Sequence, residues 1–549
     1  MSSCGSASCD ASGSLAKRRL PFLFGKGLDL PPHCERPQYL RQGQVLPLPR
    51  TTETDWERPT SDTCRCAEEK SVPRTDNSPP RIYCFSEPGP GFPTYAYGKQ
   101  LGIKNMKSRI HLSEHFTYRK LLRFTLPSVV MNLFASVYIV ADGYFVANFA
   151  GKTEFAAVNL IMPVLNILGT IGYMFGVGGS ALIAKTLGEK DHERANRLFS
   201  LIVLVTSGLG VLLMIPGFIL MPQIAGLLGA EGKLLEDSVL YGRIFILALP
   251  AWIWVYEFQL FFVTAEKPGL GLAVTVCAGL CNVVLDALFI IGFRWGLAGA
   301  AAASALTQVV GGVFPLVYFS RKNNSLLRLV KPVWDGRAVL KACTNGTSEF
   351  MSEAAWSLVG IVYNIQLLKY AGEKGVIIYG LLMYVSLIFS AVFVGYSNGA
   401  GPLFSYHYGA QNHMELRNLL KRSLIIIGLT SAAMFAASEA LARPFSALFL
   451  RGAENLLPES VHAFRIVSVS YLFAGLAVFG SAFFTALNDG LVSARISFLR
   501  TFVFELGAVL LLPPLFGVDG IWYSVVLAEM MAAVTGSIYM AVLQKKYHY

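Results

Sequence analysis

Long apolar stretches separated by short polar breaks dominate the chain from Leu121 onward. Each stretch exceeds the roughly 20 residues that an α-helix needs to cross a hydrocarbon core about 30 Å thick. Because lipid cannot hydrogen-bond to an open backbone, such segments are predicted to be helices. The pattern predicts twelve membrane-spanning helices, over residues 121–148, 155–184, 198–221, 240–264, 269–292, 296–319, 342–369, 376–403, 420–443, 461–485, 491–514 and 518–543.

The second half of this apolar region repeats the first. In the register that sets Gly188 over Gly409, ALIAKTLGEKDHERANRLFS lies over PLFSYHYGAQNHMELRNLLK, and WGLAGAAAASALTQ lies over FGVDGIWYSVVLAE. Six helices per repeat is an even number, so both repeats have the same orientation in the membrane. We therefore expect an all-α polytopic membrane protein of two six-helix lobes, related by a pseudo-two-fold axis along the membrane normal. The N-lobe covers residues 115–320, a cytosolic linker 321–341 and the C-lobe 342–545.

Residues 1–105 are polar, rich in Pro, Ser and Arg, and without helical or strand periodicity. This composition predicts a disordered N-terminal extension. Six of the nine cysteines lie there, at spacings that fit no zinc site, so no metal centre is expected. Met106 opens MKSRIHLSEHF, a basic lead-in to the first apolar stretch. We expect Met106 to be the working start and the extension to be dispensable or not native.

Composition and charge place the chain in a membrane. Hydrophobic residues make up 54% of the chain and charged residues 15%, against about 25% charged in soluble proteins, which argues against a soluble enzyme. The net charge of +11 falls mainly on connections that share one side of the predicted membrane. By the positive-inside rule both termini are expected in the cytosol. The charge is then an orientation signal, and we expect a monomer in a bacterial inner membrane, contacting lipid but no nucleic acid.

Four polar side chains are predicted at one depth in the N-lobe. Asp142 and Asp286 each lie about six residues, or roughly 9 Å, before the outer end of their helices. Asn282 lies one turn from Asp286, and Ser304 reaches a similar depth in the sixth helix. Acids inside a membrane are functional candidates by default, and oxygen ligands suit a small hard cation. These residues are therefore predicted to bind a coupling ion, with proton and sodium both open.

Further acids fall in the C-lobe. Glu349 and Glu353 share a face near the inner end of the seventh helix, and Glu505 and Glu529 lie in the outer halves of the last two helices. These four are candidates for substrate or proton handling, with Arg500 expected to neutralise Glu505. The histidines His407 and His413 are expected in a solvated cytosolic loop.

The chain resembles the multidrug and toxic compound extrusion (MATE) family. The likeness rests on LPSVVMNLFASVYIVADGYFVANFAG, on the paired LG…D…R loops and on CNVVLDALFIIGFRWGLAGAAAAS. In that family an aspartate on helix 1 and an Asn-x-x-x-Asp pair on helix 5 form a cation site, which match Asp142, Asn282 and Asp286. The helix 6 hydroxyl of the family matches Ser304. Many members carry an acid on helix 7 where this chain has Trp356, so Glu349 or Glu353 is its candidate replacement.

The resemblance implies a cation-coupled antiporter without a cofactor. Proton or sodium would enter while organic compounds, often cationic and amphipathic, leave by alternating access. Two transporter alternatives stay open, a lipid-linked oligosaccharide flippase of the same superfamily and a major-facilitator-type transporter. A prenyltransferase would need Asp-rich diphosphate motifs on the cytosolic side, and no Walker A sequence is present, so an enzyme or a direct ATP drive is not expected.

Overall fold

The structure is a computed structural model, and it describes residues 110–450 and 454–549. The expectations for residues 1–105 and for Met106 lie outside this part. All described regular elements are helices: α3 (Tyr118–Phe145), η2 (Val146–Ala150), α4 (Lys152–Gly188), α5 (His192–Leu227), α6 (Gly232–Ile246), α7 (Leu249–Thr264), α8 (Pro268–Asp286), η3 (Ala287–Gly292), α9 (Gly296–Ser320), α10 (Gly336–Gly409), α11 (His413–Phe449), η4 (Glu454–Leu456), α12 (Leu457–Ser468), α13 (Tyr471–Ala486), α14 (Gly490–Phe498), η5 (Leu499–Glu505), α15 (Leu506–Leu511), α16 (Pro513–Phe516) and α17 (Val518–Tyr547).

The described helices confirm the predicted all-α membrane fold with twelve spans. Nine are long and apolar enough to cross a membrane, and two bent pairs, α6 with α7 and α12 with α13, each add one more. The twelfth comes from α10, whose 74 residues exceed any single crossing. At Gly372 its backbone leaves the helical region with φ 65° and ψ −158°, which divides α10 into two spans.

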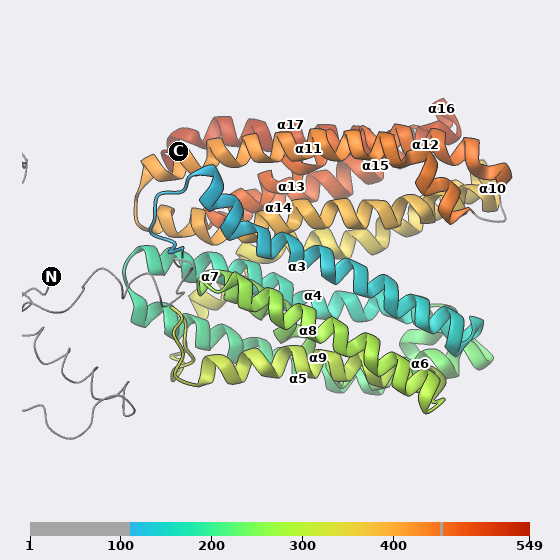
Figure 1. The fold of residues 1–549 in the computed structure, drawn as a ribbon, viewed down its shortest axis with the longest axis horizontal. Coiled ribbons are helices and arrows are strands. Elements are labelled where there is room, and N and C mark those ends of the chain that lie inside the picture. The colour runs from blue at the N-terminus through green and yellow to red at the C-terminus, as the bar shows by residue number, and fades with distance from the viewer. Residues whose placement is uncertain (1–109, 451–453) are drawn as a thin grey trace, which may run out of the picture. The chain divides into compact units, whose positions relative to one another are not determined.

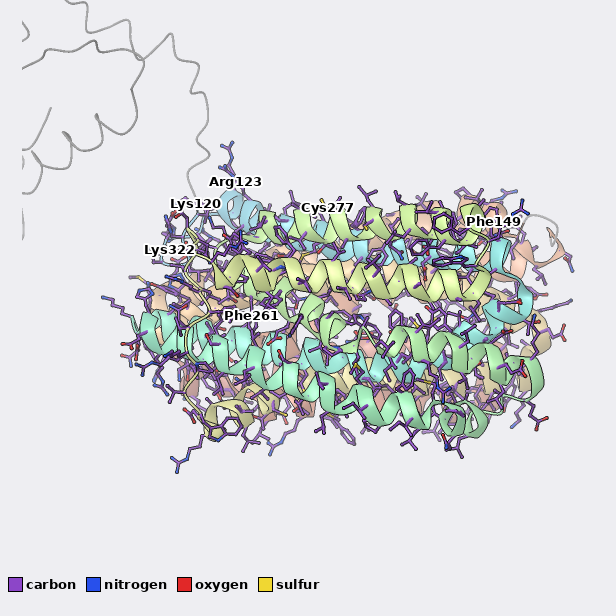
Figure 2. All side chains as sticks on the ribbon, turned by 90° about the horizontal axis from the view of Figure 1, so that it is seen from below. Lys120, Arg123, Phe149, Phe261, Cys277 and Lys322 are labelled. Carbon is purple, nitrogen blue, oxygen red and sulfur yellow. The ribbon has the colours of Figure 1, made fainter. Side chains whose placement is uncertain are left out.

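The helices run side by side, with the connections gathered at two ends (Figure 1). We call the end where α3 begins and α17 finishes the terminal end, and the end where α5 passes to α6 the far end. Lys120, Arg123 and Lys322 lie at the terminal end, whereas Phe149 lies at the far end (Figure 2). Lys322, which belongs to the predicted basic linker 321–341, therefore lies at the same end as Lys120 and Arg123.

The two halves repeat one another in backbone conformation as well as in sequence. Residues with positive φ recur in the second half at a nearly constant separation from those in the first. The recurring pairs are Gly151 with Gly372, Lys190 with Gln411, Glu266 with Asn488 and Gly296 with Gly517. Because positive φ is costly for most residues, this recurrence indicates equivalent turns. The helix caps also recur in the two halves. Asp191 accepts a hydrogen bond from the Arg194 amide, and Asn412 accepts one from the Glu415 amide.

Glycines allow the two halves to touch at the terminal end. A Cβ on Gly188 would lie 2.0 Å from the Tyr406 carbonyl oxygen, and a Cβ on Gly409 would lie 2.0 Å from that of Lys185. These two glycines are repeat equivalents, so the contact between α4 and α10 is reciprocal. Gly346 is tighter still, because its Cβ would lie 1.8 Å from the Met174 carbonyl oxygen. No other residue type fits these positions without moving the halves apart.

A short segment before α3 is attached to both halves, and we call residues His111–Phe116 the strap. His111 Nδ1 and the Leu112 amide bond the carboxylate of Glu266, at 2.8 and 2.7 Å. Four residues later, His115 Nδ1 and the Phe116 amide bond the carboxylate of Glu415 in the same way, at 2.6 and 2.8 Å. The side chains of Leu112 and Phe116 are fully buried. One short segment therefore connects the N-half and the C-half at the terminal end.

Removing one anchor of the strap should cost stability. Glu415→Ala leaves a buried amide and a histidine nitrogen without their acceptor, and hydrogen bonds to charged groups contribute about 2 kcal/mol. We expect a lower thermal midpoint of the purified protein. The exposed pair Lys185–Glu189, at 3.5 Å and four residues apart on one helix, provides the control. Glu189→Ala should change stability by about 0.4 kcal/mol at most, and an equal loss in both variants would refute the role of the strap.

One sequence expectation at this end is wrong. His407 does not lie in a solvated loop, because α10 continues to Gly409 and the His407 side chain is only 2% exposed. Its ring packs edge-on against Phe116 of the strap, with 6.4 Å between ring centroids. The sequence pattern missed this because the strap, which covers the histidine, is not itself a long apolar segment.

Candidate functional site

The N-half residues predicted to bind a cation come together from three helices. Asp142 lies near the end of α3, Asn282 and Asp286 near the end of α8, and Ser304 near the start of α9. Ser304 Oγ donates a hydrogen bond to Asp142 Oδ1 at 3.2 Å. The carboxyl groups of Asp142 and Asp286 interact directly with each other. The structure thus places both acids in one site.

Several oxygens of this site have no donor from the protein. Asp286 is fully buried, and neither of its carboxyl oxygens accepts a hydrogen bond from a described residue. The side-chain oxygen of the buried Asn282 is likewise without a donor. Burying an ionised carboxylate without compensation is very costly. A proton or a small cation between these oxygens would satisfy them, so the site has the composition of an ion-binding site.

π-Helical turns accompany the acids in both halves. Within the described residues there are three, and each is next to a candidate acid. The turn η2 begins four residues after Asp142, η3 begins directly after Asp286, and η5 contains Arg500 and ends at Glu505. Such turns insert one residue into a helix and often mark functional positions.

Three further residues lie beside this site, and sequence reasoning missed two of them, Tyr241 and Gln308. The buried Tyr241 of α6 lies within reach of Ser304 and of both acids. Tyr138 of α3 and Gln308 of α9 lie close to each other one turn from the site. Tyr138 is an aromatic of the first predicted helix, four residues from Asp142, and four-residue spacing from Ser304 could have indicated Gln308. No spacing could have indicated Tyr241, because α6 belongs to a different span.

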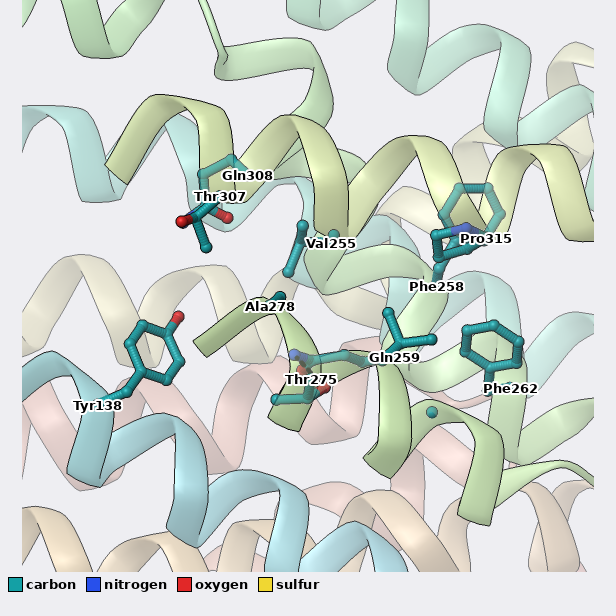
Figure 3. Close-up of a pocket in the computed structure, with 13 residues that line it drawn as sticks. Tyr138, Val255, Phe258, Gln259, Phe262, Thr275, Ala278, Thr307, Gln308 and Pro315 are labelled. Carbon is teal, nitrogen blue, oxygen red and sulfur yellow. Dashed lines mark hydrogen bonds between the residues drawn. The ribbon is translucent and has the colours of Figure 1, made fainter. Parts of the chain in front are cut away.

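A small chamber with both apolar and polar lining groups continues from the site toward the terminal end (Figure 3). It has a volume of about 20 Å³, enough for about one water molecule. Its polar lining groups come from Tyr138, Gln259, Thr275, Thr307 and Gln308. Thr307 Oγ1 is buried and has no protein partner, and Gln259 Nε2 donates to Thr275 Oγ1 at 3.4 Å. The helix directions place this chamber between the acid pair and the terminal end.

The C-half acids form a second cluster, centred on Arg500. This arginine donates to Glu529 Oε1 from Nε at 3.2 Å and from Nη2 at 2.6 Å. Its direct ion pair is therefore with Glu529 rather than with Glu505, and Glu505 and Glu349 are within its electrostatic range. Glu353 is close enough to Glu349 to interact with it. Three acids thus share one arginine and a fourth lies beside them, which leaves the cluster with an excess of acidic groups.

Comparison with known proteins decides the family. The MatE family model matches residues 127–288 and again residues 350–509. The chain belongs to the MatE family. The two matches cover corresponding segments of the two halves, so they also confirm the internal repeat found in the sequence. As a MatE protein it is an integral membrane transporter, in agreement with the resemblance noted above.

Related MatE proteins and structures cover most of the chain. The Multidrug export protein MepA of Staphylococcus haemolyticus is 24% identical over 424 residues, covering 77% of this chain and 93% of that protein. The MepA of Staphylococcus aureus strain MSSA476 is 22% identical, covering 78% and 94%. A solved MATE transporter described as outward-facing matches with a TM-score of 0.74 and 22% identity, covering 78% and 98%. A transporter from Pyrococcus furiosus matches with a TM-score of 0.74, 21% identity and coverage of 79% and 98%.

Proposed function

We propose that this MatE protein is a cation-coupled antiporter that exports organic compounds across the plasma membrane. The observation that carries the proposal is the acid pair, in which Asp142 accepts a hydrogen bond from Ser304 and the carboxyl oxygens of the buried Asp286 have no donor among the described residues. An intramembrane acid in this state is stabilised by taking up a proton or a small cation. The staphylococcal relatives named multidrug export proteins support the direction of transport.

We propose that the terminal end faces the cytosol, which places both termini inside. The lysines and arginines at that end support this orientation by the positive-inside rule. The glycine contacts of α4 with α10 then close the cytosolic end. In this state the acid pair would receive its ion from outside. The chamber lined by Thr307 and Gln308 would begin the route by which the ion leaves toward the cytosol.

The C-half cluster supports organic cations as the exported class. The cluster contains four acidic side chains and the single positive charge of Arg500. The acids are Glu349, Glu353, Glu505 and Glu529. Tyr363 and Tyr379 stack near this cluster, with 5.3 Å between their ring centroids, and aromatic faces attract organic cations. A flippase for anionic lipid-linked sugars would need basic groups in this position, so the acidic excess favours the antiporter.

The proposal is tested by ethidium efflux in everted vesicles containing the full-length protein. Imposed proton and sodium gradients are applied separately. We expect one of the two gradients to accelerate ethidium uptake into the vesicles, and ethidium addition to dissipate that gradient. Transport that is indifferent to both gradients would refute ion coupling, and it would leave the fold and the family unaffected.

A further inference from the structure

An unpaired arginine near the far end of the N-half distinguishes the two repeats. Pro222 of α5 and Arg243 of α6 recur at equivalent places in the second half, as Pro444 of α11 and Arg465 of α12. Equivalent positions in equivalent helices would be expected to form equivalent contacts. The contacts differ, because the C-half arginine is paired with an acid and the N-half arginine is not.

In the C-half the arginine is paired with an acid. Arg465 Nε lies 3.7 Å from Glu439 Oε2, and the other oxygen of Glu439 accepts from the hydroxyl of Ser468. In the register that sets Pro222 over Pro444, the N-half counterpart of Glu439 is Gly217, which has no side chain to offer. Among the described residues, Arg243 forms no ion pair with any carboxylate. Its charge is therefore not neutralised by an ion pair with any residue that the structure describes.

The proline at position 222 determines where the guanidinium of Arg243 lies. Pro222 has no amide hydrogen, so the carbonyl of Phe218, four residues earlier, has no helical donor. Arg243 Nε donates to that carbonyl at 3.3 Å. The guanidinium carbon also lies 5.2 Å from the centroid of the Phe218 ring. These contacts involve Nε and the guanidinium carbon of Arg243. They leave Nη1 and Nη2 available to a ligand.

Arg243 is part of the lining of a groove on the outer surface of the helices. The groove has a volume of about 560 Å³ and is apolar except for two charged side chains. Its apolar wall includes Phe218, Leu240, Ile244 and Leu247, and its charged groups are Glu236 and Arg243. Leu240 and Leu247 belong to a membrane-spanning region, and their exposed fractions are 43% and 56%.

The depth of the groove corresponds to the headgroup boundary. The 36 residues of α5 span about 54 Å, whereas the hydrocarbon core measures about 30 Å, which leaves about 12 Å of helix beyond the core at each end. Phe218 lies nine residues, or about 14 Å, before Leu227 at the end of α5. Arg243 is therefore at the level where lipid phosphates meet acyl chains.

We propose that this groove binds one phospholipid with a primary amine in its headgroup, such as a phosphatidylethanolamine. The phosphate lies on Arg243, the amine on Glu236, and an acyl chain along Leu240, Ile244 and Leu247. Glu236 and Arg243 are seven residues apart, two turns on one face of α6, with the acid nearer the far end. A zwitterionic headgroup has this charge order, since its amine is farther from the acyl chains than its phosphate. Arginine forms charge-assisted bonds to phosphate oxygens in the same way as to carboxylates.

The test is lipid titration of the purified full-length protein, followed by native mass spectrometry. The probes are 1-palmitoyl-2-oleoyl phosphatidylethanolamine and the corresponding phosphatidylglycerol, which keeps the phosphate and lacks the amine. We expect Arg243→Gln to weaken the tightest phosphatidylethanolamine binding by about tenfold, the ratio for loss of a hydrogen bond to a charged group. The matched variant Arg465→Gln, whose arginine is already paired, should bind this lipid as the wild type does.

A second variant tests the amine without touching the arginine. Glu236 is exposed, so Glu236→Gln should fold normally, and it should remove the preference for phosphatidylethanolamine over phosphatidylglycerol. Equal weakening in Arg243→Gln and Arg465→Gln would overturn the proposal, because it would show a general effect of surface charge. An unchanged lipid preference in Glu236→Gln would also overturn it. Circular dichroism of each variant identifies any misfolded protein. If Arg243→Gln is misfolded, the result for Glu236→Gln decides the test.

Discussion

Replacing Asp286 by Asn is expected to reduce ion-driven efflux to that of vesicles without the protein. Asn keeps the size of the side chain and removes the group that would take up a proton or bind a cation with full charge. Because Asp286 is buried and its carboxyl oxygens have no protein donors, loss of the charge should not destabilise the fold. Gradient-driven ethidium uptake and the thermal midpoint, measured on the same preparation, separate these two effects. Asp142→Asn should behave in the same way.

A second buried acid of the same half provides the control. Glu257 of α7 is also fully buried, and its Oε2 accepts a hydrogen bond from Thr206 at 2.8 Å. It interacts with neither acid of the pair. Glu257→Gln should therefore transport at a rate close to that of the wild type. Wild-type transport by both Asp142→Asn and Asp286→Asn would remove the assigned ion site, whereas loss in all three variants would indicate a general intolerance of neutral substitutions.

Replacing Gly346 by Ala is expected to open the terminal end. The added Cβ would lie 1.8 Å from the Met174 carbonyl oxygen, and real contacts of this kind are not shorter than about 3 Å, so α4 and α10 must separate. Overpacking of a close interface costs about 3 kcal/mol. We expect slower transport and faster alkylation of Cys343, whose sulfur now lies 4.0 Å from that of Met174. The measurement requires a variant in which Cys343 is the one remaining cysteine.

Gly401 is the matched control for this experiment. It lies on the same helix, and no atom would be within 4 Å of a Cβ added there. Gly401→Ala should leave Cys343 labelling unchanged and should stabilise the helix by about 1 kcal/mol through its better helix propensity. Equal labelling rates in Gly346→Ala and in the wild type would show that the glycine contact does not hold the terminal end closed.

The sequence predicted the spans and the acid pair because both depend on local pattern. A run of apolar residues is long enough to cross the membrane whatever surrounds it, as for α5 and α17. Asn282 and Asp286 share a face through helical spacing alone. Depth counting then placed Asp142 and Ser304 in the same layer, and the structure brings these residues together.

What the sequence could not predict depends on contacts between distant segments. Arg500 lies five residues from Glu505 along the chain and yet bonds Glu529, because α17 packs beside η5. Tyr241 reaches Ser304 from another span, and His407 is buried by the strap rather than by its own helix. The reciprocal glycine contacts also need both halves in place, since glycine alone does not indicate what approaches it.

The strap limits how far its two anchors can travel. His111 and His115 are four residues apart, so the chain between the two clamps has a contour of at most about 14 Å when fully extended. Glu266 and Glu415 cannot move apart beyond that reach while both clamps hold. A wider opening of the terminal end must therefore release one carboxylate, which makes such an opening a discrete uncoupling step rather than a gradual stretch.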